Sequence, residues 1–207
     1  SNRNSNTGYK QITVSVTNEN DAPVIKTIDN ITDTLNDSDY LYNSPTITSL
    51  ENGNYSLNYS ISLGRGSNTY TQLFNSNGEK ISDIKMTESD LLDNLNFKSL
   101  ALTNGNYIIS WAAGSYNGSY NVYAQVFDSN GNSIDTMVVS EEGNRFPNIH
   151  IENLSDGNYI ISWNTYKDGE TQYLAKVYNS NNEQIGNELT LESEYVKGLS
   201  AYAKEEL

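Results

Sequence analysis

The stretch Leu102–Trp111 (LTNGNYIISW) decides the fold, because the chain contains it in three versions. Leu50–Tyr59 (LENGNYSLNY) precedes it and Leu154–Trp163 (LSDGNYIISW) follows it. The glycines of these stretches lie at positions 53, 105 and 157, so the period is 52 residues. Self-similarity at a fixed period of this length is the signature of a repeat architecture, in which each repeat is one supersecondary unit.

A second block repeats with nearly the same period. It reads LFNSNG from Leu73, VFDSNG from Val126 and VYNSNN from Val177. Its spacings of 53 and 51 residues indicate that the loop between the two blocks differs by one residue from unit to unit. The block predicts a hairpin turn in every unit. Asn182 is tolerated in place of glycine because asparagine enters the left-handed region more easily than other residues.

Each unit predicts four short strands. The second strand alternates with a period of two, so that Tyr107, Ile109 and Trp111 lie on one face. Before it, an Asn-Gly or Asp-Gly turn uses the positive φ that glycine adopts at low cost. The first strands are expected at 46–50, 98–102 and 148–152, a third strand at 121–127, and fourth strands at 134–140 and 185–191.

Four antiparallel strands in a unit of about fifty residues are typical of a β-propeller blade. We therefore predict an all-β fold, a β-propeller-like array of four-stranded antiparallel blades that occupies residues 24–207. An all-β sandwich is the alternative, although a sandwich does not need the same hairpin every 52 residues. The full repeats are expected at 45–96, 97–145 and 146–198, followed by a truncated fourth repeat at 199–207.

The composition argues against several classes of partner and site. The 207 residues contain 12 Lys and Arg against 26 Asp and Glu, a net charge of −14, whereas nucleic acids and anionic membranes attract basic surfaces. No cysteine is present and His150 is the single histidine, which argues against disulfide scaffolds, thiol nucleophiles and multi-histidine metal sites. No apolar run approaches the roughly 20 residues of a membrane helix. We therefore expect neither nucleic-acid binding nor membrane insertion.

The N-terminal stretch 1–23 differs in kind from the repeats. Ile12–Thr17 (ITVSVT) is an alternating strand, and NENDAPV follows it from Asn18. This order resembles the last strand and linker of cadherin-like and VCBS-type repeats in large bacterial surface proteins. The resemblance implies calcium between consecutive domains, with Asn20 and Asp21 at linker positions whose oxygen atoms suit this cation. Asn18 stands where true cadherins have an aspartate, and a linker without bound metal is the alternative.

The repeats are similar to those of giant secreted bacterial adhesins and RTX-type proteins, most clearly over Tyr123–Asn132 (YAQVFDSNGN). This resemblance implies a secreted or cell-surface location rather than a particular chemistry, since such arrays usually lack an assigned activity. High acidity and the absence of cysteine fit an exported bacterial chain. Its expected neighbours are further domains of the same long protein.

Polar side chains suited to catalysis are few. Glu141 and Glu142 are adjacent carboxylates that we expect in a loop as solvated charge, and His150 is expected to face solvent or a neighbouring strand. We therefore predict no catalytic residue. Asp128–Asp135 (DSNGNSID) has the composition of a calcium loop, but an ordinary hairpin explains the same position in all three units.

Aromatic side chains are the remaining candidates. Tyrosine and tryptophan stack on sugar rings while amides supply hydrogen bonds, and the loops between second and third strands are the most variable part of each unit. We therefore predict four ligand-binding residues beside those loops: Tyr116, Tyr120, Tyr166 and Tyr173. Trp111 and Trp163 are expected in the core.

These observations predict a non-catalytic extracellular adhesion module that binds a glycan or a protein. Two alternatives stay open. One is a structural spacer of an adhesin, rigidified by calcium at its linkers. The other is a fragment of a propeller-type carbohydrate-active enzyme.

Overall fold

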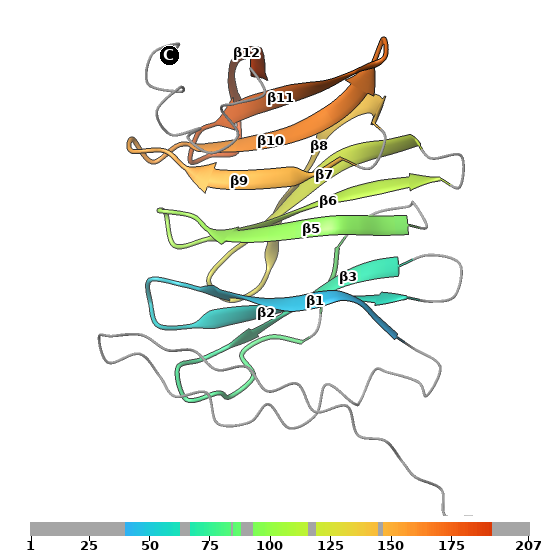
Figure 1. Ribbon diagram of the computed structural model, residues 1–207. Helices are drawn as coiled ribbons and strands as arrows, with labels where there is room; N and C mark the ends of the chain where they lie inside the picture. Colours follow the sequence, from blue (N-terminus) through green and yellow to red (C-terminus); the bar gives the residue numbers. More distant parts are fainter. Residues whose placement is uncertain are drawn as a thin grey trace, which may run out of the picture.

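The computed structural model describes residues 40–62, 67–83, 85–87, 93–115, 119–144 and 147–191 (Figure 1). This part of the chain is all-β, with its strands in three groups of four that we call blades 1, 2 and 3. Blade 1 comprises β1 (Tyr40–Ser49), β2 (Tyr55–Ser62), β3 (Ser67–Phe74) and β4 (Lys85–Met86). Blade 2 comprises β5 (Asp93–Ala101), β6 (Tyr107–Ser115), β7 (Ser119–Phe127) and β8 (Ser133–Asn144). Blade 3 comprises β9 (Ile149–Asn153), β10 (Tyr159–Lys167), β11 (Glu170–Tyr178) and β12 (Gln184–Leu191).

Consecutive strands pair antiparallel within each blade, which confirms the predicted four-stranded units. A parallel bridge between Ser67 and Asp93 joins β3 to β5, so that blades 1 and 2 are continuous at that point. Figure 1 shows the blades layered one on another, and over the described residues they form an open array rather than a closed ring. None of the described residues forms a helix long and apolar enough to cross a membrane.

Several strands extend beyond their predicted ends. β1 and β5 begin before the expected unit boundaries at residues 45 and 97. β8 reaches Asn144 because its bulged pairing with β7 continues to Tyr120. Glu141 and Glu142 therefore lie within a strand, and their expected place in a loop was wrong. The predicted N-terminal strand and linker at 1–23 and the partial repeat at 199–207 lie outside the described residues.

The turn between the first and second strands has the same geometry in every blade. Gly53, Gly105 and Gly157 have φ values of +83°, +86° and +87°. Each donates its backbone N–H to the carbonyl of the leucine three residues earlier. Asn182 has a φ of +67°, so asparagine does adopt the left-handed conformation in the third hairpin. The predicted turn chemistry is confirmed in all three blades.

The two faces of a blade have different roles. We call the face that carries Tyr107, Ile109 and Trp111, or the equivalent residues, the aromatic face, and the opposite side the back face. The aromatic face of blade 2 packs with Leu50 and Leu73 of blade 1, and that of blade 3 packs against the back face of blade 2. Burying one large apolar side chain contributes about 1.5–3 kcal/mol, so these two junctions account for most of the cohesion between blades.

A stacked pair of aromatic rings joins the second and third strands of every blade. The two members are direct cross-strand partners, an arrangement that adds about 0.5–1.5 kcal/mol to the burial of the rings. Burial raises the pKa of Tyr107 to about 12, so its hydroxyl stays protonated at neutral pH. The ring centroids lie 5.3 Å apart in Tyr55–Phe74, 5.1 Å in Tyr107–Phe127 and 5.4 Å in Tyr159–Tyr178.

The junction between blades 1 and 2 is polar at its centre. Ser99 of β5 accepts hydrogen bonds from the Thr48 hydroxyl at 2.7 Å and from Asn58 Nδ2 at 3.1 Å. Thr48 and Asn58 are buried on the back face of blade 1. Because a buried donor loses water on folding, the Thr48 hydroxyl depends on Ser99 for an acceptor, whereas Asn58 Nδ2 also donates to Ser56 Oγ at 3.1 Å and Thr48 Oγ1 at 3.4 Å.

The junction between blades 2 and 3 is mostly apolar, with hydrogen bonds at its margins. Lys176 Nζ of β11 donates to the carbonyl of Val139 in β8 at 2.7 Å and lies 6.0 Å from the centre of the Trp163 ring. Asn153 Nδ2 of β9 donates to the carbonyl of Ala101 in β5 at 2.8 Å. These bonds fix the lateral position of blade 3 on blade 2.

We expect Ser99→Ala to lower the free energy of unfolding by about 1–3 kcal/mol, because the buried Thr48 hydroxyl loses its acceptor and Asn58 Nδ2 loses one of its three. Urea unfolding followed by circular dichroism measures the change. Ser155→Ala, at an exposed turn position, is the matched control and should change stability by less than about 0.5 kcal/mol. Equal effects of the two substitutions would contradict the assigned role of Ser99.

Candidate functional site

Two of the four predicted tyrosines do not contribute to a described surface site. Tyr116 lies outside the described residues. Tyr120 is only 5% exposed and packs in the core between blades 2 and 3, so its expected place at the surface was wrong. The reason is Gly114, directly across the ladder, where an added Cβ would lie 2.6 Å from the Tyr120 ring. The ring covers the glycine, which lacks a side chain of its own to fill that part of the core.

The other two tyrosines share the back face of blade 3. In the pairing of β10 with β11, Tyr166 is opposite Thr171 and Asn164 is opposite Tyr173. Tyr166 and Tyr173 are therefore diagonal neighbours on one face, within reach of a common ligand. Tyr166 is 54% exposed and Tyr173 is partly buried. The structure thus brings together two residues that the sequence predicted separately.

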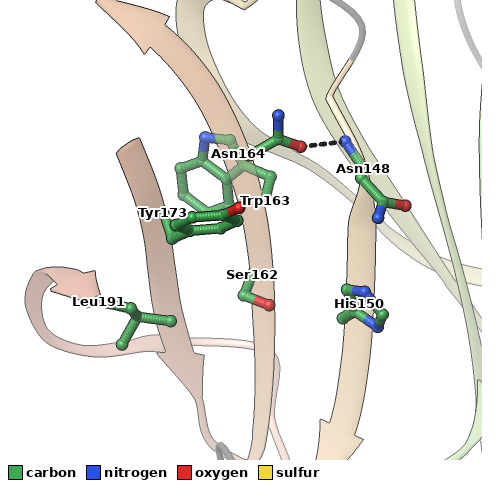
Figure 2. A pocket seen from close by; sticks show the side chains of 7 residues that line it. All are labelled: Asn148, His150, Ser162, Trp163, Asn164, Tyr173 and Leu191. Atoms are coloured by element: carbon green, nitrogen blue, oxygen red, sulfur yellow. Dashed lines mark hydrogen bonds between the residues drawn. The ribbon is translucent and has the colours of Figure 1, made fainter. Parts of the chain in front are cut away.

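A small pocket opens on this back face beside Tyr173 (Figure 2). Its volume of about 20 Å³ is on the scale of a single water molecule or hydroxyl group and far below that of a sugar ring. Strands β9, β10, β11 and β12 all contribute residues to its lining, as Figure 2 shows. The lining residues are Asn148, His150, Ser162, Trp163, Asn164, Tyr173 and Leu191.

One internal hydrogen bond orients the polar end of the pocket. Asn164 Oδ1 accepts the backbone N–H of Asn148 at 2.6 Å, shown as a dashed line in Figure 2. A carboxamide has two N–H donors and one oxygen acceptor, so this bond leaves its amide nitrogen as a donor. The lining contains no Asp, Glu, Lys or Arg. The pocket therefore offers hydrogen-bonding groups and an aromatic ring, with no carboxylate, ammonium or guanidinium group in its lining.

The stretch Asp128–Asp135, for which a calcium loop was the alternative, begins with a hydrogen-bonded turn. Asp128 Oδ1 accepts the backbone N–H groups of Asn130 and Asn132, and its Oδ2 accepts from Asn132 Nδ2 at 3.0 Å. Partial burial raises the pKa of Asp128, but these hydrogen bonds outweigh it and hold the pKa below its ordinary value. Both carboxylate oxygens thus cap the hairpin, which supports the ordinary turn over a calcium loop.

The same turn occurs in blades 1 and 3, but there the first residue is the asparagine that donates and the fifth is the carboxylate that accepts. In blade 1, Asn75 Oδ1 accepts two backbone N–H groups while Asn75 Nδ2 donates to Glu79 at 2.7 Å. In blade 3, Asn179 and Glu183 form the equivalent pair at 2.8 Å. Each hairpin therefore combines one amide with one carboxylate inside the turn.

Metal-binding candidates are limited in the part of the chain that the structure describes. Its histidine and carboxylate side chains form no group of three or more placed to hold a metal ion. Asn20 and Asp21, the predicted calcium ligands of the linker, lie outside the described residues, so that site stays a prediction.

Comparison with protein families and with curated proteins found no match to this chain. Among solved structures, the crystal structure of an endo-arabinase from Bacteroides thetaiotaomicron VPI-5482 is similar, with a TM-score of 0.49 and 19% sequence identity. The similarity covers 72% of this chain and 61% of the endo-arabinase chain, which is less than two thirds of that protein.

Sequence reasoning missed most of the pocket. Asn148 and Asn164 lie outside the repeated motifs, Ser162 lies within one but was not singled out, and His150 was considered only as a metal ligand and a catalytic base. A signal was nevertheless present: Asn164 lies 52 residues after Ala112 and two periods after Ser60, so the third unit replaces two small residues with a larger amide. Recognising its importance requires knowing which face of β10 that position occupies.

We expect Asp128→Ala to lower the free energy of unfolding by about 1 kcal/mol at pH 7, because two backbone donors lose their acceptor. A carboxyl with a depressed pKa stabilises the fold above its unfolded pKa, taken as 3.8, and loses this effect as pH falls through the folded pKa. The difference between wild type and Asp128→Ala, measured by urea unfolding, should therefore shrink as pH is lowered below 3.8.

A double substitution provides the control for this turn. Asp128→Asn combined with Asn132→Glu recreates the pair found in blades 1 and 3 and should restore stability to within about 0.5 kcal/mol of wild type. A stabilisation by millimolar calcium that disappears in Asp128→Ala would contradict the turn-capping role and support the calcium loop.

Proposed function

We propose that this chain is a non-catalytic ligand-binding module of adhesion type, with carbohydrate as its ligand, in a large secreted or surface-attached bacterial protein. The observation that carries the proposal is the placement of Tyr166 and Tyr173 on one accessible face, beside amide and hydroxyl groups. Aromatic rings present an apolar surface to the C–H face of a sugar, while amides and hydroxyls exchange hydrogen bonds with its hydroxyl groups.

The structural roles of the groups with shifted pKa values support the non-catalytic part of the proposal. Burial raises the pKa of Tyr107, Tyr159 and Tyr178, and all three belong to the stacked pairs that join two strands within a blade. The Asp128 carboxyl with its lowered pKa caps a turn. These shifts arise from packing and turn formation, whereas catalytic groups have shifted pKa values within a cleft.

The location rests on the sequence. The Asn-Asp-Ala-Pro linker and the repeats resemble those of bacterial surface proteins, and the net charge of −14 suits a setting where divalent cations offset self-repulsion. Calcium at Asn20 and Asp21 belongs to the same proposal, as do neighbouring domains of the same protein as partners.

A structural spacer is the second candidate, favoured by the continuity of the junctions. Hydrogen bonds from Asn153 to Ala101 and from Lys176 to Val139 hold consecutive blades rigidly, which is what a stalk requires. A spacer binds no glycan and stiffens with calcium at its linkers. A ligand-binding module binds a glycan through the accessible face of blade 3.

We expect Tyr166→Ala to weaken glycan binding about tenfold, because truncating an aromatic anchor in a binding site typically costs more than about 1 kcal/mol. The wild-type chain is first surveyed on an array of glycans, and affinity is then measured by calorimetry. Val138→Ala on β8 removes an equally exposed apolar side chain from another surface and should leave the affinity unchanged.

Three results would contradict this proposal. Wild-type protein that binds no glycan would favour the spacer, and equal weakening by both substitutions would remove the role of Tyr166. Release of reducing sugar from a polysaccharide by the purified chain would show an enzyme, the remaining alternative.

A further inference from the structure

The pairing of β10 with β11 shows where blade 3 departs from the other two. Asn164 pairs with Tyr173, and the equivalent pairs are Ser60 with Thr69 in blade 1 and Ala112 with Val122 in blade 2. The pairs of blades 1 and 2 are fully buried on the back faces of their blades. Asn164 and Tyr173 are partly exposed instead, and both side chains are larger than their equivalents.

The side chains of the pairs in blades 1 and 2 are of the kinds that pack between sheets. Ser60 and Thr69 bond to each other through their hydroxyls at 3.0 Å, and Ala112 and Val122 are apolar members of the core between blades 2 and 3. The third pair instead presents an amide donor and a phenol ring at the mouth of the pocket. A position that only packs against a neighbouring sheet does not need these groups, whereas a ligand site does.

We propose that the pocket formed by Asn148, His150, Ser162, Asn164 and Tyr173 is the primary subsite for a neutral sugar. This inference rests on the proposed function and names its site and ligand class. Tyr173 provides the ring on which the sugar stacks, and Tyr166 extends that surface diagonally across the strands. Asn164 donates a hydrogen bond through its amide nitrogen, because the backbone of Asn148 holds its oxygen at 2.6 Å.

The size and charge of the pocket define the ligand further. A volume of about 20 Å³ admits one hydroxyl or hydroxymethyl group, so the sugar ring lies over the opening with a single substituent inside. The Ser162 hydroxyl and the His150 ring line this space and can bond that substituent. Because the lining carries no Lys or Arg, the site does not favour sialylated or sulfated sugars over neutral ones.

The repeat itself supplies the variants for the test. Asn164→Ala and Tyr173→Val install the residues that blade 2 has at the same positions, so the fold is already known to accept them there. Gln172→Asn makes the same kind of exchange on the aromatic face, since blade 2 has Asn121 at that position, and it is the matched control. Tyr173→Phe retains the ring without its hydroxyl.

Affinity is measured by calorimetry with the best neutral glycan from the array and with a sialylated glycan of the same core. We expect Asn164→Ala and Tyr173→Val each to weaken binding at least fivefold, while Gln172→Asn and Tyr173→Phe stay within twofold of wild type. Thermal unfolding of each variant, within a few degrees of wild type, excludes loss of the fold as the cause. Stronger binding of the sialylated glycan would overturn the neutral ligand class.

The outcomes separate this inference from the proposed function. A wild type that binds glycan, with pocket variants that bind equally well, overturns the subsite and leaves the proposed function standing. A wild type that binds no glycan overturns both. Concentration-dependent self-association in analytical ultracentrifugation, abolished by Tyr173→Val, would show that this face docks another sheet and would overturn the subsite.

Discussion

The stacked ring pair between the second and third strands is the contact on which the rest of the array depends. Tyr107 and Phe127 lie opposite each other and immediately beside the two turns of their blade, so their contact fixes the register of the hairpin. A slip of one residue between the two strands would turn the side chains of one strand to the opposite face and separate the two rings. Because the aromatic faces of blades 2 and 3 each pack on the preceding blade, the register within a blade also determines the packing between blades.

The topology separates constant and variable parts of the blade. In a four-stranded meander the first and third turns lie at one end and the second at the other. The constant end carries the glycine turns and the hydrogen-bonded amide–carboxylate hairpins, as the left side of the layers in Figure 1 shows. The opposite end carries the connection between β10 and β11, where Asp168 and Gly169 have positive φ values of 53° and 90°. The three units differ in sequence at this second connection, and Tyr166 lies beside it.

Much of the fold was predictable because local rules and the repeat agree. The 52-residue period gave the number of strands, the glycine turns gave their ends, and alternation identified Tyr107, Ile109 and Trp111 as one buried face. Strand length was less predictable, since the bulged pairing of β7 with β8 depends on contacts across the sheet. The period of the sequence does not show how far a strand extends beyond its predicted end.

The site was predictable only in part. Proximity to a variable loop selected Tyr166 and Tyr173, which the structure places on one face of blade 3, and their role in ligand binding stays a prediction. The same rule failed for Tyr120, because the glycine opposite it draws the ring into the core. Asn164 and Ser162 became visible as pocket residues only when the pairing showed which positions of blade 3 share the back face. A rule based on chain position does not distinguish the two faces of a strand.

The unlike chemistry of the two junctions has a consequence for assembly. Tandem repeats with similar sequences risk pairing out of order during folding, when a sheet docks on the wrong neighbour. If blade 3 were to dock on blade 1, Ile151 would occupy the place of Ser99, the buried Thr48 hydroxyl would lose its acceptor, and Asn58 Nδ2 would lose one of its acceptors. The difference between the polar first junction and the mostly apolar second junction therefore disfavours wrong pairings and gives the blades a single order along the array.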